Sequence, residues 1–141
     1  MAFARFVRAA ITSDPITIYG DGSQIRDFTF ISDVVRANML AAAVAIEPGT
    51  VVNISGGDQV SINDTLDILS TLRGSPLDVH YSANATGDVY RTCGDNAHAY
   101  ALLGWSPRVG VEEGLQRHYS WMSSRNATLA SRPSTPTVTT K

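Results

Sequence analysis

Lysine and cysteine are the two residue types that this sequence most clearly lacks. Ten of its eleven basic residues are arginine, and the one lysine is Lys141, the last residue. A reaction that needs a lysine ammonium therefore has no candidate inside the folded part of the chain. Cys93 is the single cysteine, which excludes a disulfide framework and a cysteine-rich metal site.

Long apolar runs and an excess of positive charge are also missing. The longest apolar stretch, residues 39–46, is too short to span a bilayer. The formal net charge is -2 and the pI is near 5.8, so no basic field attracts nucleic acid or an anionic membrane. Arg5 and Arg8 interrupt the apolar pattern of the N-terminus, which has no cleavage-like site and does not resemble a signal peptide. We therefore expect a cytoplasmic protein whose partners include no nucleic acid and no membrane.

The residues that are present are typical of one globular α/β domain. With 141 residues, 43% of them hydrophobic, the chain can bury a core without disulfides. Helical and alternating apolar spacings predict both kinds of element. The expected helices are 1–11, 33–47, 62–72, 95–103 and 111–122, and the expected strands are 16–19, 27–31, 51–54 and 77–81. Because the strands are few and short, the pattern predicts one side of a larger fold.

The loop after the first expected strand is the most informative segment. Gly20 and Gly22 allow the backbone to approach a ligand closely, and Arg26 offers a planar, permanently charged fork that suits phosphate oxygens. The alternative is a glycine turn in which Arg26 pairs with Asp21 or Asp27. The residues alone leave both interpretations open.

Asp88 is a second candidate, because a loop carboxylate can accept two hydrogen bonds from a vicinal diol such as a ribose. A solvated turn aspartate is the alternative. The three histidines lie on different expected elements and have no metal-ligand spacing: His80, His98 and His118. No Gly-x-Gly-x-x-Gly opens a helix and no Tyr-x-x-x-Lys is present, so the sequence predicts neither a dinucleotide loop nor that catalytic pair.

Five motifs, in a fixed order, carry a specific resemblance. They are ITIYGDGSQIRDFTFISDVVRA at 16–37, VNISGG at 52–57, GDV at 87–89, Asp95 with its helix, and LLGWSP at 102–107. In this order they resemble NAD-dependent nucleotide-sugar epimerases and dehydratases, which are extended short-chain dehydrogenase/reductases. The resemblance covers about residues 1–121. It implies an α/β fold that is the C-terminal, substrate-binding portion of an extended Rossmann-type fold and lacks the Gly-rich NAD-binding half.

The resemblance also implies binding roles, and none of them is catalytic. Arg26 matches the arginine that contacts the diphosphate, and Asp88 matches the carboxylate that holds the nucleotide ribose hydroxyls. Met1 and Phe3 resemble the start of the segment that folds over the nucleotide. The strand that borders a uracil or thymine base is matched by three residues: Thr17, Ile18 and Tyr19.

Two positions depart from the family's pattern. Many members have an arginine three residues before the ribose carboxylate, where this chain has Ala85, and another where it has Tyr90. Arg91 is the candidate to compensate. A missing charge-assisted bond of about 1.5–3 kcal/mol would weaken phosphate binding roughly ten- to a hundredfold.

The family's NAD loop and its Tyr-x-x-x-Lys lie upstream of the matched region. NAD is therefore expected in the intact parent enzyme, a homodimer, and no cofactor is expected on this chain alone. The expected partners are a UDP- or dTDP-linked sugar and an NAD-binding domain in cis or trans. We expect residues 1–124 to be the nucleotide-sugar-binding part and residues 125–141 to be a disordered tail rich in Ser, Thr and Pro.

The expected parent reaction is a UDP-glucose-type 4-epimerisation, and the chain alone is expected to be inactive. Within the family, 4,6-dehydration of dTDP-glucose and decarboxylation of UDP-glucuronate are the alternatives. A stand-alone, non-catalytic binding module and a decayed remnant are the alternatives outside it. The 141-residue chain is expected to be marginally stable and to expose apolar surface that promotes self-association.

Overall fold

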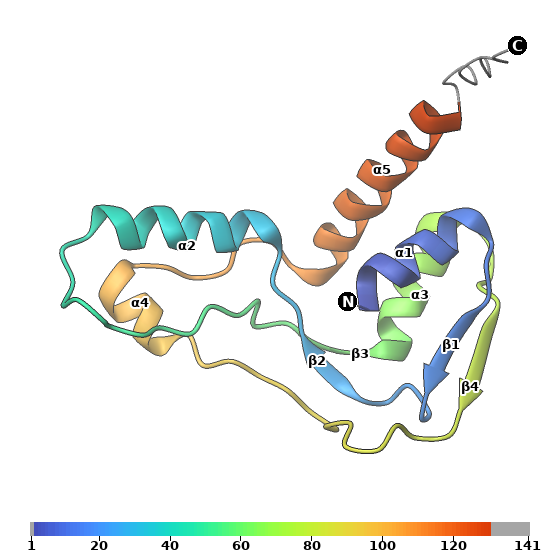
Figure 1. Ribbon diagram of the computed structural model, residues 1–141, viewed down its shortest axis with the longest axis horizontal. Helices are drawn as coiled ribbons and strands as arrows, with labels where there is room; N and C mark the ends of the chain where they lie inside the picture. Colours follow the sequence, from blue (N-terminus) through green and yellow to red (C-terminus); the bar gives the residue numbers. More distant parts are fainter. Residues whose placement is uncertain (1, 131–141) are drawn as a thin grey trace, which may run out of the picture.

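The structure is a computed structural model that describes residues 2–130 (Figure 1). Its elements are α1 (Ala2–Thr12), β1 (Ile16–Tyr19), β2 (Ile25–Asp27), α2 (Ile31–Ala43), β3 (Gln59–Ser61), α3 (Ile62–Arg73), β4 (Val79–Ser82), α4 (Ala97–Leu103) and α5 (Val111–Ala130). Figure 1 shows α2 and α4 together at one end of the molecule, which we call the small lobe. The large lobe contains α1, α3, α5, β1 and β4, and β2 and β3 lie between the two lobes.

Three helices and a two-stranded sheet enclose the core of the large lobe. α1, α3 and α5 pack against one another, and β1 runs parallel to β4 with Ile16 opposite Val79. Residues of β1 alternate between buried and exposed, as expected for a strand with one covered face. The core consists of Phe6, Val7, Ala9, Ala10, Ile16, Ile18, Ile62, Leu66, Leu69 and Leu115.

The start and end of α3 confirm the sequence expectation. Ser61 is the N-cap: its Oγ accepts the N–H of Asp64 at 3.0 Å, and its own N–H donates to the Asp64 carboxylate at 3.0 Å. This reciprocal pair satisfies two backbone donors that the helix leaves unpaired. Gly74 ends the helix with a φ of 77°, a left-handed conformation that glycine adopts without steric cost.

Asp33 and Trp105 organise the small lobe. Trp105 is fully buried with Ala37, Ala99 and Leu103, and its indole N–H donates to the Asp33 carbonyl at 3.0 Å. The Asp33 carboxylate accepts the N–H groups of Arg108 and Val109 and the Arg36 guanidinium. Burial tends to raise the pKa of Asp33, but these hydrogen bonds outweigh it and hold that pKa below its ordinary value.

Residues 51–54, which were expected to form a strand, do not form one. Their side chains alternate as in a strand: Val52 and Ile54 pack against the small-lobe core, whereas Val51 is 80% exposed. Within residues 2–130 no hydrogen bond involves the backbone of this segment. The expectation is wrong because a strand needs a partner strand, and the described part of the chain places none beside it.

The strand expected at 27–31 is also displaced. β2 covers only Ile25–Asp27, because its antiparallel partner β3 begins at Gln59, which lies opposite Asp27. α2 then begins at Ile31 with Phe30 as its N-cap, two residues before the expected start of this helix at residue 33. Asp95 accepts the N–H of Ala97 at 2.8 Å in front of α4, where a helix start was expected.

The last helix continues past the expected boundary at residue 125. α5 runs to Ala130, so residues 125–130 are helical and the expectation of a disordered tail is corrected for them. The first proline after the start of α5 is Pro133. The Arg125 guanidinium lies 5.1 Å from the centre of the Trp121 ring. The remainder of the expected tail, 131–141, lies outside the described residues. Within the described range no helix has the length and apolar character needed to cross a membrane.

Candidate functional site

The structure brings Arg26 and Asp88 into direct contact. Arg26 Nη2 donates to Asp88 Oδ1 at 2.6 Å, and Arg26 Nη1 donates to the carbonyls of Ile25 at 2.8 Å and Tyr90 at 3.3 Å. The side chains are 21% and 41% exposed, so both are accessible to a ligand. The two residues to which the resemblance gives diphosphate and ribose roles therefore share one surface.

The alternative in which Arg26 pairs with Asp21 or Asp27 is wrong. Asp21 instead accepts hydrogen bonds from the hydroxyl and the N–H of Ser23, which lower its pKa. Asp27 accepts backbone N–H groups of Gly56, Gly57 and Gly94. Neither carboxylate neutralises Arg26.

The segment that contains Arg91 runs alongside β2. A parallel bridge joins Ile25 to Arg91, with Ile25 N donating to the Tyr90 carbonyl at 2.8 Å and Thr92 N donating to the Ile25 carbonyl at 3.2 Å. The Arg91 Nε donates to Gln59 Oε1 at 2.6 Å. Arg91 pairs with Ile25 and contacts Gln59, the register partner of Asp27. Because successive residues of a strand point to opposite faces, the Arg91 side chain lies on the face opposite to that of Arg26, away from the Arg26–Asp88 pair.

The three residues of β1 that the resemblance assigns to the base, residues 17–19, differ in exposure. Ile18 is 3% exposed as a whole residue, belongs to the large-lobe core and pairs with Tyr81 of β4, so it offers almost no surface to a ligand. Thr17 and Tyr19 are exposed, Tyr19 by 52%. Gln24 Nε2 donates to the Tyr19 carbonyl at 2.9 Å, which ties the end of β1 to the loop that leads to Arg26.

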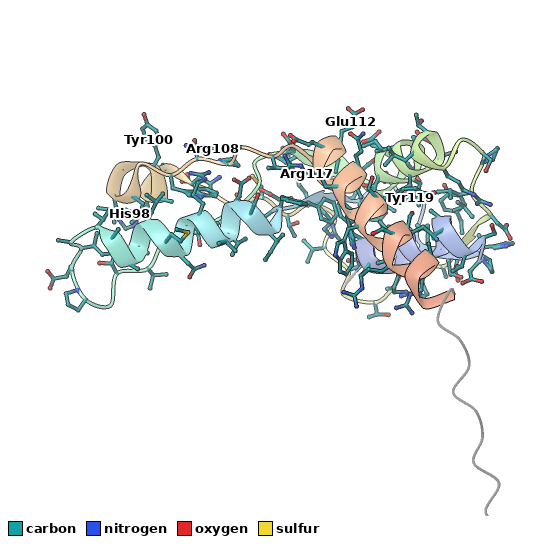
Figure 2. All side chains as sticks on the ribbon, turned by 90° about the horizontal axis from the view of Figure 1, so that it is seen from above. His98, Tyr100, Arg108, Glu112, Arg117 and Tyr119 are labelled. Atoms are coloured by element: carbon teal, nitrogen blue, oxygen red, sulfur yellow. The ribbon has the colours of Figure 1, made fainter. Side chains whose placement is uncertain are left out.

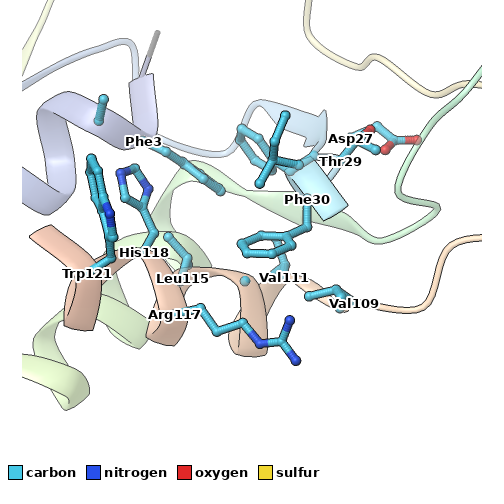
Figure 3. Close-up of a pocket in the computed structure, with 15 residues that line it drawn as sticks. Phe3, Asp27, Thr29, Phe30, Val109, Val111, Leu115, Arg117, His118 and Trp121 are labelled. Carbon is cyan, nitrogen blue, oxygen red and sulfur yellow. The ribbon is translucent and has the colours of Figure 1, made fainter. Parts of the chain in front are cut away.

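Phe3 lies in a different place from the arginines. Its ring stacks on Phe28 with centroids 3.7 Å apart, and both line an apolar cavity of about 850 Å³ between α1, residues 27–31 and α5. Figure 3 shows Phe3, Phe30 and Leu115 around this cavity. Arg26, Asp88, Arg91 and residues 17–19 are not among its lining residues. Met1, the other residue given this role, lies outside the described residues.

The residues present do not fit a dinucleotide site. Such a site needs a glycine-rich loop that leads from a strand into a helix N-terminus. Gly20 and Gly22 lie between two strands, and α3 follows β3 directly, with Asp64 in its first turn. Among residues 2–130 no group of three or more His, Cys, Asp or Glu side chains could hold a metal ion. The arrangement offers charged and polar groups for binding an anion and a diol.

Sequence reasoning missed the contacts of Asp27 and Gln59 in this region. The Asp27 carboxylate accepts the N–H groups of Gly56 and Gly94, and the Gln59 side chain accepts a hydrogen bond from Arg91. The available signal was the glycine pattern, because Gly56-Gly57 and Gly94 predict close backbone approaches. The sequence does not indicate which side chain receives their N–H groups.

Known proteins that resemble this chain agree on one family. The sequence profile of the GDP-mannose 4,6 dehydratase family matches residues 2–118. A UDP-glucuronate 4-epimerase from Thermodesulfobacterium geofontis is 36% identical over 122 residues, which is 86% of this chain and 37% of that protein. A UDP-glucuronic acid decarboxylase 1 from Xenopus tropicalis is 33% identical over 118 residues, covering 82% of this chain and 28% of that protein.

A solved structure of a related enzyme is also similar to this chain in its fold. UDP-glucuronic acid 4-epimerase from Bacillus cereus, in complex with UDP-glucuronic acid and NAD, superposes with a TM-score of 0.83 and is 33% identical, over 89% of this chain and 40% of that one. The chain thus spans about two fifths of the length of that enzyme. The chain belongs to the family of NAD-dependent nucleotide-sugar epimerases and dehydratases, and its α/β fold corresponds to their C-terminal portion.

Proposed function

We propose that this chain is the nucleotide-sugar-binding part of an NAD-dependent enzyme that carries out a UDP-glucose-type 4-epimerisation. The observation that carries the proposal is the exposed contact between Arg26 and Asp88. It places cationic donors beside a carboxylate, as a diphosphate next to a ribose requires. The 4-epimerases similar to this chain support the choice of reaction. Relatives also include a decarboxylase, and 4,6-dehydration and decarboxylation remain the alternatives within the family.

Each residue has a distinct role in the proposed complex. Arg26 turns its fork from Asp88 toward the diphosphate, and the released Asp88 accepts hydrogen bonds from the ribose hydroxyls. The exposed Tyr19 ring borders the base. Because Arg26 gains phosphate oxygens and Asp88 gains hydroxyl donors, the ligand replaces the pair without leaving either group unsatisfied.

NAD supplies hydride transfer in the intact enzyme, and we propose that a separate NAD-binding half holds it, in cis or in trans. Two features of the small lobe support such a partner. Ile31, Val35 and Met39 form an exposed apolar stripe on α2, and they are 65%, 50% and 68% exposed. Residues 51–54 have strand-like alternation with an unpaired backbone. A sheet edge contributed by the partner would satisfy both features.

Binding of UDP and UDP-glucose, measured by isothermal titration calorimetry, tests the proposed site. Arg26→Ala is expected to weaken binding roughly ten- to a hundredfold, through loss of about 1.5–3 kcal/mol of charge-assisted hydrogen bonding. Arg8→Ala, which removes an exposed arginine of α1, is the matched control and should bind like the parent chain. Equal affinities for the parent chain and Arg26→Ala would contradict the phosphate assignment.

Enzyme assays test the proposal that this chain binds the nucleotide-sugar and that a separate half holds NAD. The 141-residue chain alone is expected to interconvert no UDP-hexoses, because the family's catalytic tyrosine and lysine motif is not in it. Addition of an NAD-binding half from a 4-epimerase of this family is expected to restore epimerisation. Epimerase activity of the purified chain, free of host enzyme, would overturn the proposal of an inactive binding part. A sharp, cooperative thermal transition in a monomeric sample would instead favour a stand-alone binding module.

A further inference from the structure

Asp27 is a charged side chain that the proposed binding roles do not use, although both of its oxygens are engaged. Its Oδ1 accepts the N–H of Gly56 at 2.9 Å and of Gly57 at 3.3 Å, and its Oδ2 accepts the N–H of Gly94 at 3.2 Å. The three amides belong to two loops that are distant in sequence. One carboxylate therefore joins the end of β2 to both loops.

Two glycines around Asp27 lie in close contact with neighbouring residues. A Cβ on Gly56 would lie 1.7 Å from the carbonyl oxygen of Phe28, and a Cβ on Gly94 would lie 2.5 Å from the Cβ of Ser55. The Asn96 side chain also accepts the N–H of Ser55 and donates to its carbonyl, each at 2.9 Å. These contacts join the same two loops, so Asp27 belongs to a packed junction and not to an isolated surface bond.

Arg26 of the candidate site lies between two points at which its segment is fixed. At the first point, backbone hydrogen bonds join Ile25 to residues 90–92. At the second, the Asp27 carboxylate holds Gly94. Because the chain is fixed on both sides of Arg26, the backbone that carries its guanidinium has a defined position. Binding then requires less ordering of the backbone.

We propose that Asp27 is a positioning residue for anion binding, which acts by fixing residues 93–96 and 55–57 against β2 and so sets the placement of Arg26. This inference rests on the proposed function for its ligand, a nucleoside diphosphate. Asp27 itself does not touch the ligand. Its negative charge is satisfied by backbone N–H groups, so Asp27 does not compete with Asp88 for the Arg26 guanidinium.

The single cysteine provides a spectroscopic test that needs no ligand. Cys93 is exposed and precedes Gly94, so a trifluoromethyl label on its thiol reports on the loop that Asp27 holds. The labelled parent chain should give one sharp ¹⁹F resonance, and Asp27→Asn should give a broadened or split one. Asp33→Asn is the matched control, because it damages a similar carboxylate junction in the small lobe and should leave the ¹⁹F line unchanged.

Titration with UDP connects the junction to binding. Asp27→Asn is expected to lower UDP affinity at least tenfold, whereas Asp33→Asn lowers the thermal midpoint and leaves the affinity of the folded protein unchanged. A parent chain that fails to bind UDP overturns the proposed function, and the ¹⁹F comparison still decides whether Asp27 fixes the loop. Unchanged ¹⁹F lines and unchanged UDP affinity in Asp27→Asn overturn the positioning role.

Amide hydrogen exchange in the unmodified chain covers the case in which Asp27→Asn does not fold. The Gly56 and Gly94 amides lie in loops, and their only acceptor among the described residues is the Asp27 carboxylate. Protection of both amides supports the junction. Exchange at the rate of an unstructured peptide would overturn it.

Discussion

At the scale of single residues, aspartates in different surroundings perform different tasks. Asp33 is 2% exposed and accepts two backbone N–H groups, whereas Asp88 is half-exposed and pairs with Arg26. The buried group is committed to the fold, because breaking its hydrogen bonds leaves buried donors without partners. The exposed group can exchange its partner for a ligand. Burial and partner type therefore separate structural from candidate binding carboxylates in this protein.

Replacing Asp33 by Asn is expected to destabilise the protein by about 2 kcal/mol at neutral pH, because buried N–H groups lose a charged acceptor. The pKa of Asp33 is lowered in the folded state, so its contribution is present above the unfolded pKa of about 3.9 and is lost as the pH falls through the folded value. Urea unfolding at several pH values checks this. The difference between parent and variant should shrink in acid, and Asp67→Asn, at an exposed position of α3, should show no such change.

The neighbouring residues Ile18 and Tyr19 are expected to respond oppositely to truncation. Ile18→Ala should cost about 2–5 kcal/mol of stability, because Ile18 lies in the large-lobe core. Tyr19→Ala should leave stability nearly unchanged and weaken UDP binding by roughly tenfold, since stacking of a base on an aromatic ring is worth about 1–3 kcal/mol. Thermal unfolding and calorimetric titration of both variants distinguish the two roles. If neither variant binds UDP more weakly than the parent chain, β1 is not part of the proposed site.

At the scale of elements, the reciprocal cap of α3 is a local feature with a measurable effect. Ser61→Ala removes the acceptor for the Asp64 N–H and is expected to lower the free energy of unfolding by about 1 kcal/mol. Ser106, whose hydroxyl makes no hydrogen bond in the described part of the chain, provides the control through Ser106→Ala. Chemical denaturation of both variants should show a loss for Ser61→Ala alone.

Elements that depend on nearby residues were predictable from the sequence, and those that depend on distant ones were not. Ser61 and Gly74 define α3 within their own segment. β3 exists because Gln59–Ser61 meets β2, and residues 51–54 fail to form a strand because no strand lies beside them. Arg26 was a candidate from its own chemistry, whereas its contact with Asp88 joins residues far apart in sequence. The junction at Asp27 depends on three such contacts and had only its glycines as a signal.

At the scale of the whole molecule, the two lobes differ in how completely they are covered. The large lobe encloses its core between three helices. α2 buries Asp33 and Ala37 on one face and exposes the stripe of Ile31, Val35 and Met39 on another. Such a stripe marks an interface or a surface prone to association. Figure 2 shows the small lobe extending away from the helices of the large lobe, with Tyr100 on the outer side of α4.

The exposed stripe is expected to make the isolated chain self-associate. The double variant Val35→Gln/Met39→Gln should shift the sedimentation profile toward the monomer, because it removes apolar surface from this face. Tyr100→Gln removes an equally exposed aromatic residue, 67% exposed, from α4 outside the stripe and should sediment like the parent chain. If the double variant and the control associate equally, another surface is responsible.

The separation of Arg26 from Asp88 along the chain has a practical consequence. The two residues are 62 positions apart, and the exposed turn at Pro48-Gly49 lies between them. Cleavage at this turn would assign one member of the pair to each of two peptides. Neither peptide alone would contain the complete ion pair, so nucleotide binding by a mixture would report that the peptides had reassembled. The turn therefore offers a site for a split-protein sensor in which ligand binding and reassembly are read out together.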